Sequence, residues 1–315
     1  MPRRPCSGEA LRFPLPRACA AAPGSGTSVS WTSRPGRHPP NLPALPPVEP
    51  VRGNPPPNTP DERQISTPAV RSYDPKMSDA RWETVDHYIE HLLVRPDAGM
   101  EAALRESAAA GLPTIQVSPL QGKSLQLLVA SLGVRRVLEI GTLGEYSAIW
   151  MARALPSHGR IVTLEADPRH AEVARSNFAR ARVSEKIEVR VGPALKTLPD
   201  LAREGGEPFD LVFIDADKPN TAAYFDWAMR LARPGAVIVV DNVVRQGALA
   251  DPSNPDSSVR GMRRFLERVA AEPRAEGTVV QTVGAKGYDG FALVRVAPPT
   301  PSPAEPDESK RPRVG

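Results

Sequence analysis

At 315 residues the chain can hold one large domain, but 18 of its 37 prolines precede Met77 and six follow Val296. Residues 1–76 carry ten Lys and Arg against five Asp and Glu, which leaves 30 basic and 31 acidic residues, a net charge of −1, for the remainder. That remainder therefore lacks the concentrated positive charge of a nucleic-acid-binding domain. Its lack of a long apolar run argues against a membrane span, and both cysteines lie in the first 20 residues, so the core has no thiolate metal site.

The two proline-rich ends, residues 1–76 and 298–315, are predicted to be disordered because they lack the periodic apolar pattern of a packed core. The first 48 residues are rich in Arg and poor in acids, as organellar transit peptides are. Their prolines would interrupt the amphipathic helix of such a peptide. We therefore expect a cytoplasmic protein with a disordered extension, or an upstream start codon with Met77 as the natural first residue.

Three helices are predicted where the folded domain, residues 77–297, begins. From Met77, apolar residues recur at i, i+3 and i+4 spacing until Pro96 stops the helix. A second helix is expected over residues 98–110, and a third over residues 119–132, ending near Gly133.

Strands and helices then alternate, which predicts a parallel sheet covered by helices on both faces. The expected strands are Arg136–Ile140, Ile161–Glu165, Ile187–Val191, Leu211–Asp215 and Val237–Asp241. After a helix over residues 258–271, two more strands, Thr278–Val283 and Gly290–Val296, are too close for a helical crossover and must be antiparallel. The prediction is an α/β, doubly wound, Rossmann-like fold of seven strands with a C-terminal antiparallel hairpin.

The ends of the first three strands predict a nucleoside site, because ligands of open α/β sheets bind beyond the carboxyl ends of the strands. Gly141 lets the backbone approach a ligand, while Glu139 would repel a phosphate and suit a cationic amino group. Glu165 can accept hydrogen bonds from both ribose hydroxyls. Small residues at Gly192 and Ala194 leave room for an adenine ring, although a plain strand-to-helix turn explains them equally well.

Oxygen-bearing side chains follow the fourth and fifth strands. Asp215, Asp241 and Asn242 would meet at one sheet edge, and this donor set suits Mg²⁺, Mn²⁺ or Ca²⁺ rather than zinc. Beside such a cation the ammonium form of Lys218 is disfavoured, so Lys218 could take a proton from an acceptor hydroxyl. Taken singly, these residues are explained as helix caps and a solvated lysine, but their joint placement favours a metal site.

These motifs give the chain a resemblance to the cation-dependent O-methyltransferases of the caffeoyl-CoA and catechol type, which use S-adenosylmethionine. The resemblance covers about Met77 to Val296 and rests on Leu138–Ser147, Gly192–Leu195, Phe213–Lys218, Val239–Asn242 and Gly287–Phe291. It implies a small-molecule acceptor with vicinal hydroxyls and a homodimer whose N-terminal helices help to form the acceptor pocket.

The resemblance also assigns roles to single residues. Cofactor contacts are implied for Val117, Glu139, Gly141, Thr142, Ser147, Glu165, Gly192, Ala194, Asp215 and Asp217. The metal ligands are implied to be Asp215, Asp241 and Asn242, and the catalytic base Lys218.

Glu145 departs from the family pattern, which usually has glycine before the residue that is Tyr146 here. With a positive φ a glutamate costs roughly 1 kcal/mol, and its carboxylate would crowd that of the cofactor. We expect the loop to turn Glu145 outward into solvent.

Two other functions stay open from the sequence alone. A non-catalytic binding protein on the same fold would explain Glu145. A nicotinamide-dependent oxidoreductase would need a third glycine after the first strand and a Tyr-x-x-x-Lys pair, and the sequence offers neither.

Overall fold

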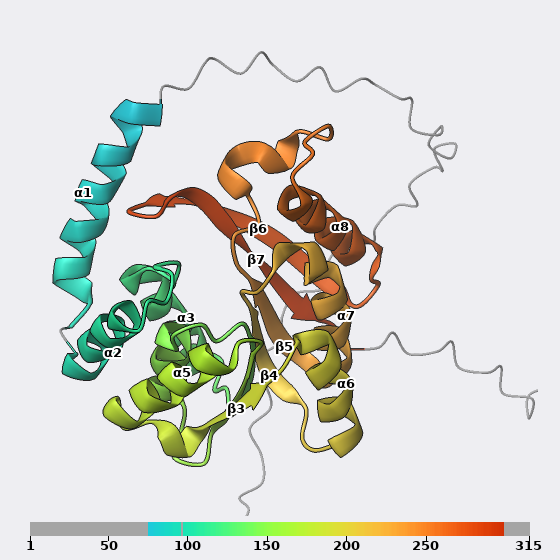
Figure 1. Ribbon diagram of the computed structural model, residues 1–315. Coiled ribbons are helices and arrows are strands. Elements are labelled where there is room, and N and C mark those ends of the chain that lie inside the picture. The colour runs from blue at the N-terminus through green and yellow to red at the C-terminus, as the bar shows by residue number, and fades with distance from the viewer. Residues whose placement is uncertain (1–74, 96, 299–315) are drawn as a thin grey trace, which may run out of the picture. The chain divides into compact units, whose positions relative to one another are not determined.

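The computed structural model describes residues 75–95 and 97–298 (Figure 1). The predictions of disorder and of a targeting signal therefore fall almost wholly outside the described residues. Two residues of the predicted N-terminal extension, Pro75 and Lys76, belong to the first helix. None of the helices in the described part of the chain is both long and apolar enough to cross a membrane.

The three predicted N-terminal helices are present as α1 (Pro75–Leu93), α2 (Ala98–Ala109) and α3 (Pro119–Ser131). Side-chain caps fix where two of them start. The Asp97 carboxylate accepts hydrogen bonds from the N–H groups of Gly99 and Met100, and the Ser118 hydroxyl accepts one from the N–H of Gln121. Proline at the first position of α3 supports that start, because its ring presets the helical φ.

Seven strands form one sheet in the order β3-β2-β1-β4-β5-β7-β6. Their bounds are β1 (Arg136–Ile140), β2 (Arg160–Glu165), β3 (Ile187–Val191), β4 (Phe209–Ile214), β5 (Ala232–Val240), β6 (Ala275–Gly284) and β7 (Gly287–Val296). The first five are parallel neighbours, and β7 pairs antiparallel with both β5 and β6. The predicted fold class and strand directions are confirmed.

Some observed strands begin or end at other residues than predicted, because their backbone pairing with a neighbouring strand extends further or stops earlier. β5 begins at Ala232, earlier than predicted, because it pairs with Phe209 at the start of β4. Asp215 and Asp241 each lie one residue beyond their strand, although the Asp241 N–H still donates to the carbonyl oxygen of Ile214. The β6–β7 hairpin closes between Gly284 and Gly287, so its turn is tighter than predicted.

Helices cover both faces of this sheet (Figure 1). One face packs against α2, α3, α4 (Tyr146–Ala154) and α5 (Pro168–Arg180), and the other against α6 (Ala194–Glu204), α7 (Thr221–Leu231) and α8 (Ser257–Ala271). Successive side chains of β1 point to opposite faces of the sheet, which explains this division. Val137 packs with the first group of helices and Leu138 with the second. Strand order reverses at β1, which lies between β2 and β4, so a ligand site is expected at the carboxyl ends of these strands.

Close packing between α8 and the short helix η2 (Lys218–Asn220) gives a first prediction. A Cβ atom at Gly261 would lie 2.2 Å from the carbonyl oxygen of Lys218, so Gly261→Ala must push α8 away from η2. We expect the free energy of unfolding to fall by about 1–3 kcal/mol in urea unfolding. Arg260→Ala, an exposed neighbour on α8, should change it by less than about 0.5 kcal/mol. Equal effects of the two substitutions would contradict this packing argument.

Candidate functional site

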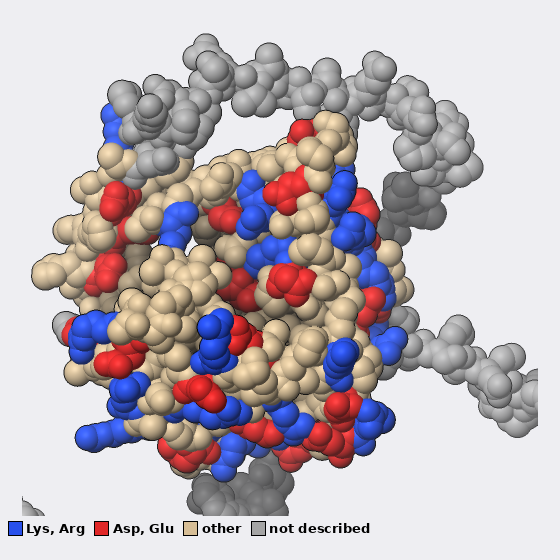
Figure 2. Space-filling model, in the orientation of Figure 1, with Lys and Arg blue, Asp and Glu red and all other residues tan. Residues whose placement is uncertain are grey.

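A cavity of about 730 Å³ opens at the carboxyl ends of the strands, which is large enough for a nucleoside-sized ligand. Most of the predicted site residues line it: Val117, Gly141, Thr142, Ser147, Glu165, Gly192, Ala194, Asp215, Asp217, Lys218 and Asn242. The other two, Glu139 and Asp241, are buried behind its wall. Figure 2 shows acidic and basic side chains interspersed over one face of the molecule rather than gathered by sign.

Glu139, on β1, holds the loop that follows the strand. Its Oε1 accepts a hydrogen bond from the Ser147 hydroxyl and its Oε2 one from the Thr163 hydroxyl, each at 2.6 Å. The Thr163 and Thr142 hydroxyls are also 2.6 Å apart, so this network reaches both ends of the loop. Burial raises the pKa of Glu139 to about 8, against the lowering effect of the Ser147 and Thr163 hydrogen bonds.

Gly141, which follows β1, has a structural reason for its identity. Its φ is +101°, and a Cβ atom there would lie 2.1 Å from the carbonyl oxygen of Asp215. Only glycine permits both the left-handed backbone and this close approach of the segments that follow β1 and β4.

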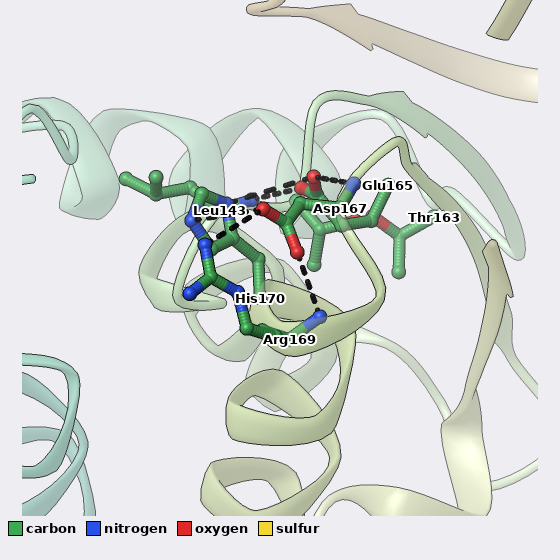
Figure 3. A network of polar contacts seen from close by, with 7 residues as sticks. Leu143, Thr163, Glu165, Asp167, Arg169 and His170 are labelled. Carbon is green, nitrogen blue, oxygen red and sulfur yellow. Dashed lines mark hydrogen bonds and ion pairs between the residues drawn. The ribbon is translucent and has the colours of Figure 1, made fainter. Parts of the chain in front are cut away.

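Glu165, at the end of β2, faces the cavity with a carboxylate that the backbone fixes (Figure 3). Its Oε2 accepts the N–H of Leu143 at 2.8 Å and its Oε1 the N–H of Asp167 at 2.9 Å. The imidazole Nδ1 of His170 lies 3.7 Å from Oε1. A carboxylate has about four acceptor positions, so Glu165 can still accept two hydroxyl donors from a ligand.

The polar residues beyond β4 and β5 meet at the other end of the cavity. The ammonium group of Lys218 donates to Asp215 Oδ1 at 2.8 Å and to the carbonyl oxygen of Asp241 at 3.2 Å. Asn242 has a left-handed φ of 56°, and its N–H donates to Asp241 Oδ1 at 2.8 Å. Burial first, and then the charge of Asp215, raise the pKa of Asp241 well above its usual range.

This cluster fits a hard divalent cation by its donor chemistry. Among residues 75–95 and 97–298, no group of three or more His, Cys, Asp or Glu could hold a metal ion. The cluster instead combines two carboxylates with the Asn242 amide. Repulsion between Asp215 and Asp241 is a cost that a cation between them would remove, and oxygen donors are what Mg²⁺ prefers.

Glu145 does not lie where the sequence led us to expect it. Its φ is +93°, which is the anticipated strain, but its side chain is only 1% exposed. Its Oε1 accepts a hydrogen bond from the hydroxyl of Ser107 on α2, at 3.3 Å. The expectation of an outward, solvated Glu145 is wrong, because α2 packs over the loop and offers a polar partner there.

Three site residues were missed by the sequence reasoning. The Tyr224 hydroxyl donates to Asp217, and His170 stands beside Glu165. The Asp289 carboxylate accepts the N–H groups of Val244 and Arg245, at 3.0 and 2.9 Å, and so holds the loop after Asn242. Only Asp289 carried a signal, since it belongs to the Gly287–Phe291 motif.

Comparison with known proteins identifies the family. Residues 94–296 match the model of a family described as O-methyltransferase. The chain is 55% identical over 212 residues to a catechol O-methyltransferase of Mycobacterium tuberculosis, covering 67% of this chain and 94% of the relative. It is 49% identical over 220 residues to a catechol O-methyltransferase of Niastella koreensis, covering 70% and 100%. An O-methyltransferase from Bacillus cereus, solved in complex with SAH, is 54% identical with a TM-score of 0.68, covering 69% and 99%.

The buried carboxyl of Glu139 predicts a pH dependence of stability. Its pKa of about 8 lies above the ordinary value of 4.5 for a glutamate, so its contribution to stability is present below about pH 4.5 and is lost as the pH rises through 8. Glu139→Gln should therefore gain stability relative to the original chain between about pH 5 and about pH 8.5, in urea unfolding at each pH. The control is Glu172→Gln, at an exposed position of α5, which should show no such gain. A difference in stability between Glu139→Gln and the original chain that stays the same across this pH range would contradict the account.

Proposed function

The chain belongs to the O-methyltransferase family, and on that premise we propose that it methylates one hydroxyl of a small molecule carrying vicinal hydroxyls, with S-adenosylmethionine as donor and a divalent metal held by Asp215, Asp241 and Asn242. Family membership excludes the nicotinamide oxidoreductase. The observation that carries the proposal is the meeting of Asp215, Asn242 and Lys218 at one end of the cavity whose other end presents Glu165. Two catechol O-methyltransferases among the relatives support a catechol-like acceptor.

The cofactor half of the cavity suits S-adenosylmethionine. Glu165 has free acceptor positions for the two ribose hydroxyls, and Gly192 and Ala194 contribute little side-chain volume to the cavity wall beyond β3. Asp217 lies in the cavity with its carboxylate oriented by Tyr224 and Asn220, and it can accept from the cofactor's amino group. A related O-methyltransferase holds SAH, which supports this assignment.

The metal half of the cavity suits proton removal from an acceptor hydroxyl. A bound divalent cation would fix the two acceptor oxygens and increase the acidity of the hydroxyl that reacts. Asp215, Asp241 and Asn242 would hold it. Lys218 Nζ, now 2.8 Å from Asp215 Oδ1, would lose that partner to the cation and become able to accept the hydroxyl proton.

The acceptor oxygen forms a bond to the methyl carbon as the bond from that carbon to the sulfonium sulfur breaks, and the sulfur leaves as a neutral thioether. The hydroxyl proton passes to Lys218 in its neutral amine form. Because the residues only position and deprotonate, the orientation of the two substrates supplies much of the rate, up to about 7–11 kcal/mol in favourable cases.

The homodimer remains a prediction. α1 exposes large apolar side chains, Val85, Tyr88, Leu92 and Leu93, which a second copy of the chain could cover. This exposed apolar surface supports the proposal of a homodimer in which the N-terminal helices take part.

Asp241→Ala tests the proposed metal cluster. The substitution removes a buried carboxylate from the cluster, so methyl transfer from labelled S-adenosylmethionine to catechol should fall by at least about 100-fold. Asp251→Ala, at an exposed position in the loop before α8, is the matched control and should stay active. SAH binding should persist in both variants, which separates loss of the metal from loss of the fold. Undiminished transfer by Asp241→Ala would contradict the proposal.

Lys218→Arg tests the proposed base. Arginine keeps the positive charge beside Asp215 but cannot be deprotonated in the accessible pH range. We expect kcat to fall by about 10²–10⁴, with the KM for S-adenosylmethionine little changed. A kcat close to that of the original chain would show that the lysine acts only through its charge.

A further inference from the structure

Glu145 lies in the wall between two cavities. The large cavity and a second one of about 30 Å³ against α2 share the lining residues Gln116, Leu143, Gly144, Glu145 and Tyr146. The segment that follows β1, residues 141–145, is thus the partition between the proposed cofactor space and the helices that cover it. We refer to this segment as the cofactor loop.

The backbone of the cofactor loop is held in an unfavourable conformation by what surrounds it. Leu143 and Glu145 both have positive φ, at 51° and 93°, although neither is glycine. Such a backbone conformation is strained for any residue but glycine, and it persists only where packing imposes it. Packing is close here, because a Cβ atom at Gly144 would lie 2.6 Å from the hydroxyl oxygen of Ser107. The loop is therefore pressed against α2.

The Glu145 side chain is the polar link across that contact. Its Oε1 accepts from the Ser107 hydroxyl at 3.3 Å, and the Asn177 amide on α5 donates to the same hydroxyl at 3.2 Å. Its Oε2 is buried and has no hydrogen-bond partner among the described residues. A buried carboxylate with one weak donor and an unpartnered oxygen is poorly compensated as an anion.

The charged groups around Glu145 supply only part of that compensation. On α5, the Arg180 guanidinium donates instead to Asn177 Oδ1 at 2.8 Å and pairs with Glu106 of α2 at 3.4 Å. On β1, the charges of Glu139 and Glu145 disfavour each other. The described surroundings therefore favour a neutral carboxyl at this position.

We propose that Glu145 is a positioning residue for the cofactor loop, tying it to α2 and α5, and that the loop holds its cofactor-binding conformation while this carboxyl is protonated. Ionisation would place an uncompensated charge in the partition, which would disturb the conformation of the cofactor loop and repel the carboxylate of a cofactor bound in the large cavity. Both effects would weaken cofactor binding. The inference rests on the proposed use of the large cavity for S-adenosylmethionine.

The pKa of Glu145 supports a transition in the neutral range. Burial raises this pKa to about 7, although the nearby Asn177 amide, the Ser107 hydrogen bond and the Arg180 charge lower it. Removing the Ser107 hydroxyl removes a donor that favours the ionised form. Ser107→Ala should therefore move the transition to higher pH without touching the large cavity, which Ser107 does not line.

The test is the dissociation constant of SAH, measured by calorimetry on the full chain from about pH 6 to about pH 8.5. For the original chain we expect Kd to rise about tenfold over this range, and for Glu145→Gln to rise by a clearly smaller factor. The difference between the two profiles isolates Glu145 from Glu139 and from the ligand's own amino group. Ser107→Ala should keep the rise but shift its midpoint upward, and Glu101→Gln, exposed on α2, should match the original chain.

Parallel profiles for the original chain and Glu145→Gln would overturn the inference while leaving the proposed function intact. So would an unshifted midpoint in Ser107→Ala, which keeps the test decisive if Glu145→Gln does not fold. If the original chain bound no SAH at any pH, the proposed function itself would be overturned, and this inference with it.

Discussion

The concentration of acidic side chains at the carboxyl ends of buried parallel strands is the constraint on which the rest of the structure depends. Glu139, Glu165, Asp215 and Asp241 all lie at or next to the ends of β1, β2, β4 and β5, where the sheet brings them to one edge. Glu139, Glu165 and Asp241 are buried there, so each of these carboxyl groups must be protonated, hydrogen-bonded or paired. The local structure differs from strand to strand because each acid meets this requirement in a different way.

Those differences divide the edge into functional regions. Hydroxyl groups surround Glu139, which stays buried and holds the cofactor loop, whereas backbone N–H groups orient Glu165 toward the cavity. The charge of Asp215 disfavours ionisation of the buried Asp241, and Lys218 is the cation that now partners Asp215. A divalent metal would compensate the charges of Asp215 and Asp241 more completely than Lys218 does. The proposed chemistry therefore belongs to the part of the edge where negative charge is least compensated.

The sequence predicted the fold and most of the residues around the cavity, because alternation, apolar strands and strand-end acids are local signals. Asp215 and Asp241 could be placed together from the rule that parallel strands end at the same edge. Glu145 could not be placed, since its direction depends on α2, which is distant in sequence and covers the loop from outside. The roles of Tyr224 and His170 were equally hidden, because each depends on which helix turn faces the cavity.

The central claim is that methyl transfer by this chain needs a divalent metal at Asp215, Asp241 and Asn242. The most direct measurement is transfer of a labelled methyl group from S-adenosylmethionine to catechol by chelator-treated protein, before and after Mg²⁺ is added back, with SAH binding measured in parallel. The account predicts no transfer in the chelator, full recovery with Mg²⁺, and SAH binding in both states. Full transfer in excess chelator would contradict it.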